Sequence, residues 1–144
     1  MTSELTDVEK HLWHLWKQAS ETVRSRIAGD LLAETGLSDG DFGVLSRLVD
    51  LGGGCLRQNE LASSMHWHRS RLSKHLTRME ERGLVVRGPS GDGVEVSILP
   101  AGTEAIERSR AVHAEAVRRH LIRLVPDGLA PELAAILDAV LHPE

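Results

Sequence analysis

The stretch His68-Arg69-Ser70-Arg71-Leu72-Ser73-Lys74-His75-Leu76-Thr77-Arg78-Met79-Glu80-Glu81-Arg82-Gly83 decides the fold of this chain. Leu72, Leu76 and Met79 recur at helical spacing, which predicts a helix over 68–82 with these side chains on its buried face. Gly83 is expected to end the helix, because glycine readily adopts the backbone conformation of a helix C-terminus. The opposite face carries basic and short polar side chains.

The segments around this helix predict a winged helix-turn-helix. Residues 56–65 are expected to form a shorter helix that precedes a tight turn. Residues 84–87 and 94–99 alternate like paired strands, and the glycine-rich segment 88–93 joins them. In this order of elements the second helix fits the major groove of DNA.

Amphipathic segments precede this module. Residues 4–28 carry apolar side chains at steps of three and four, which predicts a long helix. Gly29 and Gly36 are expected to interrupt helical structure on either side of a short connecting segment. Ser38 predicts the N-cap of a further helix, which the run 52–54 of three glycines ends.

Two more helices are expected after the hairpin. Pro100 suits the first position of one helix, residues 126–128 break it, and 131–141 form the last. The predicted fold class is therefore mainly α with a small β-wing. We expect a single domain, residues 1–144, with a winged helix-turn-helix DNA-binding lobe at 37–99 and dimerisation helices at 4–28 and 101–142.

Both end segments have apolar stripes that the small central module is unable to cover alone. An amphipathic helix must bury such a stripe somewhere. A homodimer with interleaved chain ends satisfies this requirement and supplies two reading heads for a two-fold DNA site. A monomeric helical bundle is the alternative.

The charge of the chain is unevenly distributed. The formal net charge is −4, which alone argues against a nucleic-acid binder. Residues 66–88, however, carry a net charge of +4, and the remainder carries −8. Phosphates sense the charge within a Debye length of about 8–10 Å, so this distribution favours DNA binding at one surface.

The polar face of the helix over 68–82 supplies the candidate DNA contacts. Arg71 is suited to bidentate hydrogen bonds with guanine, worth about 1–3 kcal/mol of discrimination. Lys74 and Arg78 are better placed as phosphate anchors. The alternative is a solvated helix face, which the lack of acids before Glu80 disfavours. The full set of predicted DNA-binding residues is Arg69, Ser70, Arg71, Ser73, Lys74, Thr77, Arg78 and, at the hairpin base, Arg87.

Composition excludes other classes of protein. No run of about 18 apolar residues is present, so no transmembrane helix is expected, and the start of the chain lacks a signal-peptide pattern. The single cysteine, Cys55, fits a reducing compartment, and we expect a cytoplasmic protein. No phosphate-binding loop, Gly-x-Ser-x-Gly motif or nucleophile with an oriented base is found, which indicates neither an enzyme nor a cofactor.

The frame of residues from Leu56 to Gly102 resembles the MarR (multiple-antibiotic-resistance-repressor) family of transcription factors. The resemblance rests most on the helix ending Met79-Glu80-Glu81-Arg82-Gly83-Leu84-Val85, and it covers nearly the whole chain. It implies a homodimer that binds a pseudo-palindromic operator as a regulator, expected to be a repressor released by a small ligand or an oxidant. Matched by position, Ser70, Arg71, Ser73 and Lys74 fall where the family reads the major groove.

The hairpin departs from the family pattern. The family carries Asp-x-Arg near the hairpin tip, with the arginine in the minor groove. Asp92 matches, but Val94 stands in the place of the arginine. We therefore expect weaker minor-groove readout, with Arg87 as the remaining cation able to touch phosphate.

The resemblance also implies a ligand cleft between the dimerisation helices and the DNA-binding lobe. Trp13, His14 and Trp16 lie on the first helix, and Trp67 lies just before the basic helix. These four residues are the candidate ligand-binding residues, for a small aromatic effector. Core or interface packing is the alternative for each tryptophan.

Two further modes of sensing stay open as alternatives. The pairs His11 and His14, or His113 and His120, could supply zinc ligands, but no cysteine or acidic cluster accompanies them. Cys55 is more readily explained as a structural residue than as an oxidant sensor, so no metal site is predicted. A winged-fold protein-interaction module without DNA binding is the alternative from a different functional class.

Overall fold

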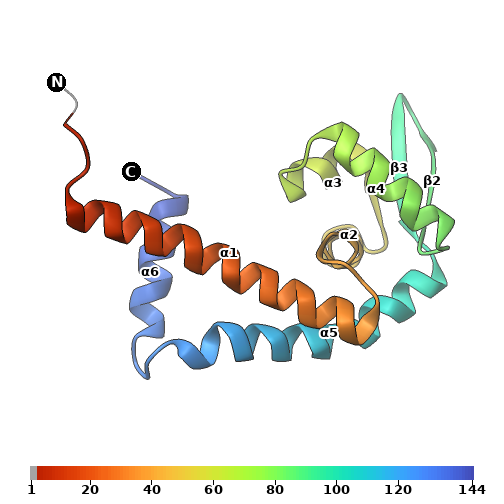
Figure 1. Cartoon of the computed structure of the whole chain (residues 1–144). Coiled ribbons are helices and arrows are strands. Elements are labelled where there is room, and N and C mark those ends of the chain that lie inside the picture. Colours follow the sequence, from red (N-terminus) through yellow and green to blue (C-terminus); the bar gives the residue numbers. More distant parts are fainter. Residues whose placement is uncertain (1–2) are drawn as a thin grey trace. The chain divides into compact units, whose positions relative to one another are not determined.

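The computed structural model describes residues 3–144, so the first two residues of the predicted domain lie outside the described part. The chain divides into two compact units. The central unit comprises Ala28–His113, and the terminal unit comprises the chain up to Ile27 together with Ala114–Glu144. Figure 1 shows the elements in sequence order, from α1 near the N-terminus to α6 near the C-terminus.

The central unit contains the winged helix-turn-helix that the sequence predicts. Its complete elements are α2 (Asp39–Asp50), β1 (Cys55–Arg57), α3 (Gln58–Met65), α4 (Arg69–Glu81), β2 (Val85–Ser90) and β3 (Gly93–Ile98). The N-cap predicted at Ser38 is confirmed as a capping box with Asp41, and Gly83 ends α4 with a φ of 72°. Helix α4 is the predicted basic helix, shortened by one residue at each end.

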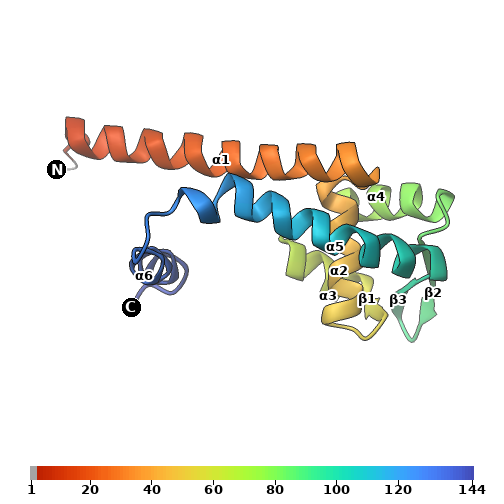
Figure 2. The same cartoon turned by 90° about the horizontal axis from the view of Figure 1, so that it is seen from below.

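The sheet has three antiparallel strands in the order β1-β3-β2. Strands β2 and β3 form the predicted hairpin, and β2 lies beside α4 (Figure 1). The third strand, β1, was not expected: residues 56 and 57 pair with β3 instead of beginning the helix. Figure 2 shows β1 between β3 and α3, where Leu56 opposes Val96. Pairing with a strand about 40 residues away decides this boundary, and local periodicity carries no sign of it.

The core of the central unit lies behind α4. Leu72, Leu76 and Met79 have no exposed surface, as the sequence predicts. They belong to one cluster with buried residues of α2, α3 and the sheet: Val44, Leu45, Leu48, Leu61, Ala62, Val85 and Val96. Burial of one face fixes which side chains of α4 face solvent.

The helix expected over 4–28 continues without a break. Helix α1 spans Asp7–Thr35, and Gly29 lies within it. A glycine in a helix interior costs about 1 kcal/mol relative to alanine, which the well-formed turns on both sides tolerate. The helix ends where Gly36 adopts a φ of 75°, so the second of the two predicted breaks is the real one.

The terminal unit consists of helical segments. It holds the first part of α1, the end of α5 (Pro100–His120), a short 3-10 helix at Ile122–Leu124 and α6 (Ala130–Leu141). Helix α5 ends at His120, earlier than the predicted break at 126–128, and these three residues instead separate the 3-10 helix from α6. No described helix has the length and apolarity needed to cross a membrane. Many large apolar side chains of this unit are exposed: Leu5, Val8, Leu12, Trp13, Leu15, Trp16, Leu121, Ile122, Leu124, Leu129, Ile136, Val140 and Leu141.

Candidate nucleic-acid interface

Helix α4 presents most of the predicted DNA contacts to solvent. His68 caps its N-terminus, because the ring Nδ1 accepts a hydrogen bond from the backbone N–H of Ser70 at 3.4 Å. The buried stripe turns the opposite side outward. The exposed residues are Arg69, Ser70, Arg71, Lys74, Thr77 and Arg78, while Ser73 is half-buried.

Three cations of this face have unused hydrogen-bond donors. Within residues 3–144, the side chains of Arg69, Arg71 and Lys74 make no hydrogen bond or ion pair. Arg78 has only a long contact, 3.5 Å, to the ring Nδ1 of His75. These side chains are therefore available to an anionic partner such as a phosphate or to a base edge.

Arg87 instead folds back onto α4. Its Nε donates to Glu80 Oε1 at 2.8 Å, and the other end of the guanidinium donates to Thr77 Oγ1 at 2.8 Å. It also reaches the backbone oxygen and the hydroxyl of Ser73, both at 3.3 Å. The hydrogen bond from Arg87 holds the pKa of Glu80 below its usual value. Arg87, Ser73 and Thr77 thus form a brace between β2 and α4, and the local sequence gives no sign of it.

A buried carboxylate joins α4 to α2. Asp41 Oδ2 accepts from Arg82 at 2.7 Å, and Asp41 Oδ1 lies 2.9 Å from His75 Nε2. Burial raises the pKa of Asp41, but the hydrogen bonds from His75, Arg82 and the Ser38 backbone outweigh it and hold the pKa well below the usual range. Asp41 therefore stays ionised and holds α4 through its contacts with His75 and Arg82.

Trp67 lies between this carboxylate network and the exposed face of α4. Its ring meets His75 edge-on, with ring centroids 5.3 Å apart. The guanidinium carbon of Arg71 lies 3.9 Å from the centroid of the same ring, which is a cation–π contact. Trp67 is half-buried and packs against the core of the central unit.

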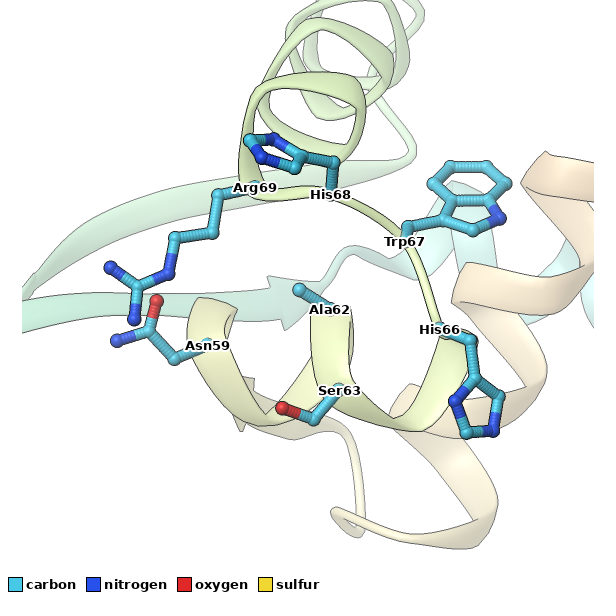
Figure 3. Close-up of a pocket in the computed structure, with 7 residues that line it drawn as sticks. All are labelled: Asn59, Ala62, Ser63, His66, Trp67, His68 and Arg69. Carbon is cyan, nitrogen blue, oxygen red and sulfur yellow. The ribbon is translucent and has the colours of Figure 1, made fainter.

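A hollow opens beside the turn between α3 and α4. Figure 3 shows Arg69 and Asn59 extending to the same side of this hollow, while the Trp67 ring lies at its other end, toward α2. His66 in the turn has a φ of 53°, in the left-handed region. The lining residues are Asn59, Ala62, Ser63, His66, Trp67, His68 and Arg69.

An arginine from outside the hairpin reaches the hairpin tip. Arg57 of β1 donates to Asp92 Oδ1 at 3.1 Å. A side chain at position 93 would collide with the Arg57 guanidinium, so Gly93 leaves room for it. Local sequence around the hairpin does not predict an arginine at its tip, because Arg57 lies 35 residues earlier in the chain than Asp92.

The other candidate ligand residues lie in a different part of the chain. Trp13, His14 and Trp16 belong to the terminal unit and are exposed, and Lys17 lies 5.4 Å from the centre of the Trp13 ring. The cleft that would combine them with Trp67 stays a prediction.

The structure shows the surroundings of Cys55 and His113, which the sequence offers as candidates for sensing an oxidant or a metal. The described residues contain no group of three or more histidine, cysteine or acidic side chains suited to a metal ion. A hydrogen bond with Glu95 raises the pKa of the Cys55 thiol, which leaves less of the reactive thiolate. His113 stacks on Phe42 with centroids 4.3 Å apart, and burial lowers the pKa of this histidine.

A family model and several solved structures are similar to this chain. A model of the MarR family matches residues 35–93. The crystal structure of AbsC, a MarR family transcriptional regulator from Streptomyces coelicolor, is 32% identical, with a TM-score of 0.87 over 99% of this chain and 95% of that chain. No curated protein sequence matches.

Two further crystal structures contain bound partners. Sco3205, a MarR family transcriptional regulator from Streptomyces coelicolor in complex with DNA, is 25% identical, with a TM-score of 0.89 over 97% of this chain and 90% of that chain. CouR from Rhodococcus jostii RHA1, bound to p-coumaroyl-CoA, is 21% identical, with a TM-score of 0.73 over 92% of this chain and 93% of that chain. The likeness to CouR shows the fold alone.

Proposed function

Because this chain belongs to the MarR family of transcriptional regulators, we propose that it binds a pseudo-palindromic DNA operator through the exposed cationic face of α4. Proteins of this family regulate transcription and are not enzymes. In this proposal α4 enters the major groove, and two copies of the chain read the two half-sites.

The observation that carries the proposal is the set of unpaired cations on α4. Arg69, Arg71 and Lys74 keep their donors free, while the nearest acid of the helix, Glu80, is neutralised by Arg87. From Arg69 to Arg78 this face carries free cations and no acid, so it attracts phosphates even though the chain as a whole is acidic.

Different side chains have different roles in this proposal. Arg71 reads a base edge, and the short Ser70 allows close approach to the groove. Lys74, Arg69 and Arg78 contact phosphates, which adds affinity for any sequence. Arg87, with Ser73 and Thr77, holds α4 against the hairpin, and this brace replaces the phosphate contact expected for Arg87.

We further propose that the exposed apolar side chains of the terminal unit form the interface between two copies. Leu12, Ile136 and Val140 are each more than 60% exposed. So many exposed apolar side chains on one small unit are typical of a surface that another chain covers. A small aromatic effector that binds near Trp13, His14 and Trp16 would release DNA only if it prefers the DNA-free conformation.

The DNA-binding proposal is tested by selecting duplexes from a random-sequence pool with the full-length protein and footprinting the result. A protected, inverted-repeat site that binds more weakly as salt rises is expected, since each neutralised phosphate contributes about −0.9 to the log–log slope. Recovery of no preferred sequence at any salt concentration would favour a protein-interaction module instead.

A further inference from the structure

Arg71 is the only cation of α4 in the described chain whose guanidinium rests on an aromatic ring. At 3.9 Å from the ring centroid, the guanidinium carbon is at stacking distance from Trp67. Such a contact restricts a long, flexible side chain without using its N–H donors. Arg71 therefore keeps the donors that a guanine O6 and N7 pair would accept.

Trp67 in turn packs against His75 and α2. Its ring meets His75 edge-on, and His75 lies 2.9 Å from the buried carboxylate of Asp41. A Cβ atom at Gly40 of α2 would lie 2.8 Å from Trp67 Cη2 and 2.8 Å from His75 Cε1. The absence of a side chain at this glycine is therefore what lets both rings pack against α2.

We propose that Trp67 is a positioning residue that holds the Arg71 guanidinium ready for base readout, so that the base preference of Arg71 depends on the Trp67 ring. This inference rests on the proposed function, in which Arg71 contacts a base. It gives Trp67 a role in sequence recognition in place of the effector-binding role considered above.

The physical reason is the cost of ordering an arginine when it binds. A free Arg71 would sample many rotamers, and binding would have to restrict them to one. Contact with Trp67 restricts the rotamers of Arg71 before DNA binds. This contact does not depend on which base the DNA presents. Removing the ring should therefore weaken binding to the preferred site more than binding to other sequences, where Arg71 gains no base contact.

The test is a double-mutant cycle on the duplex that the selection experiment yields. Trp67→Leu keeps an apolar side chain but removes the aromatic face, and Trp67→Phe restores a face. We expect Trp67→Leu to lower the affinity for the preferred duplex relative to a duplex changed at the Arg71 base pair by about three- to tenfold. Trp67→Phe should recover much of this preference, and in the Arg71→Ala background neither substitution should change it further.

A second pair of variants leaves Trp67 in place. Gly40→Ala should displace the Trp67 ring and lower the preference at the same base pair. Gly43→Ala, one turn later in α2, is the matched control, because its Cβ would meet only the flexible ends of Met65 at 3.1 Å and Arg47 at 3.3 Å. Thermal melting and circular dichroism confirm that each variant is folded before its affinity is measured.

The outcomes separate this inference from the proposed function. If Arg71→Ala changes the base preference but its effect simply adds to that of Trp67→Leu, Trp67 is only a packing residue and the inference is overturned. If Arg71→Ala changes neither affinity nor preference, the assignment of Arg71 fails first and the inference fails with it. A parallel cycle with Arg69, which extends away from Trp67 in Figure 3, should be additive.

Discussion

Arg82, the residue after α4, donates a hydrogen bond of 2.7 Å to the buried carboxylate of Asp41 in the first turn of α2. The same carboxylate lies 2.9 Å from His75, two turns earlier. One acidic side chain therefore fixes α4 at its middle and at its end. The orientation of the recognition helix depends on α2 as much as on its own buried stripe.

This relationship predicts how Asp41→Asn changes stability. The amide keeps the volume of the side chain but loses the charge that Arg82 and His75 face. We expect the free energy of unfolding at pH 7 to fall by about 2–3 kcal/mol, since hydrogen bonds to charged groups contribute more than neutral ones. Urea denaturation at fixed protein concentration measures this. An unchanged denaturation midpoint would mean that the network contributes nothing to stability.

Lowering the pH should destabilise the protein through protonation of Asp41. Because the pKa of Asp41 is lower in the folded chain than the ordinary 3.8, its contribution to stability is full above about pH 5 and is lost as the pH falls through about 4 toward the folded value. Glu80, whose pKa is also lowered, contributes in the same direction. Unfolding free energy measured from pH 7 to pH 3 should therefore fall less steeply for Asp41→Asn than for the wild type. Parallel curves would contradict this assignment.

Arg87→Ala distinguishes a brace from a phosphate contact. Loss of the contacts to Glu80, Ser73 and Thr77 should lower the unfolding free energy by about 1–2 kcal/mol. The salt dependence of DNA binding should keep its slope, whereas loss of a phosphate contact would reduce the slope by about 0.9 for each bound copy of the chain. Lys74→Ala is the control expected to reduce it. If Arg87→Ala has the denaturation midpoint of the wild type but a reduced salt-dependence slope, Arg87 contacts a phosphate, as first expected from the sequence.

Gly29 offers a stabilising substitution. It lies inside α1, and an added Cβ would meet nothing within 4 Å. Gly29→Ala should therefore raise the unfolding free energy by about 0.5–1 kcal/mol. Gly36→Ala has equal space but a φ of 75°, and it should lower stability by about 1–2 kcal/mol. The same sign of change for both variants in thermal melting would show that backbone conformation is not the deciding factor.

The apolar surface of the terminal unit predicts the oligomeric state. Ile136 is 61% exposed on α6, and a charge placed there should be costly only if another chain covers it. Sedimentation velocity should show a dimer for the wild type and a shift toward monomer for Ile136→Glu. Glu132→Gln on the same helix is the control that should stay dimeric. A monomeric wild type would contradict the proposed interface.

The sequence predicts the elements whose cause is local. The helix predicted over 68–82 is observed over 69–81, and its stop at Gly83 and its buried Leu72, Leu76 and Met79 follow from periodicity and capping. Strand β1 could not be found in this way, because its partner lies about 40 residues away in β3. The continuity of α1 through Gly29 was missed because propensity is a weak guide within a long helix.

Within the candidate interface, exposure was predictable and pairing was not. Helical spacing places Arg69, Arg71 and Lys74 on the solvent side, and they lie there. Nothing local shows that Arg87 returns to α4 or that Arg57 reaches the hairpin tip. Such pairs depend on where the chain brings distant residues together, and only the fold determines that.

Binding of the full-length protein to the selected duplex and to a scrambled duplex, measured by fluorescence anisotropy over a series of salt concentrations, tests the central claim most directly. We predict that the selected duplex binds at least about a hundredfold more tightly at physiological salt, and that Arg71→Ala removes much of this difference. Equal affinity for the two duplexes across the series, or full discrimination by Arg71→Ala, would contradict the account of α4 as a sequence-reading helix.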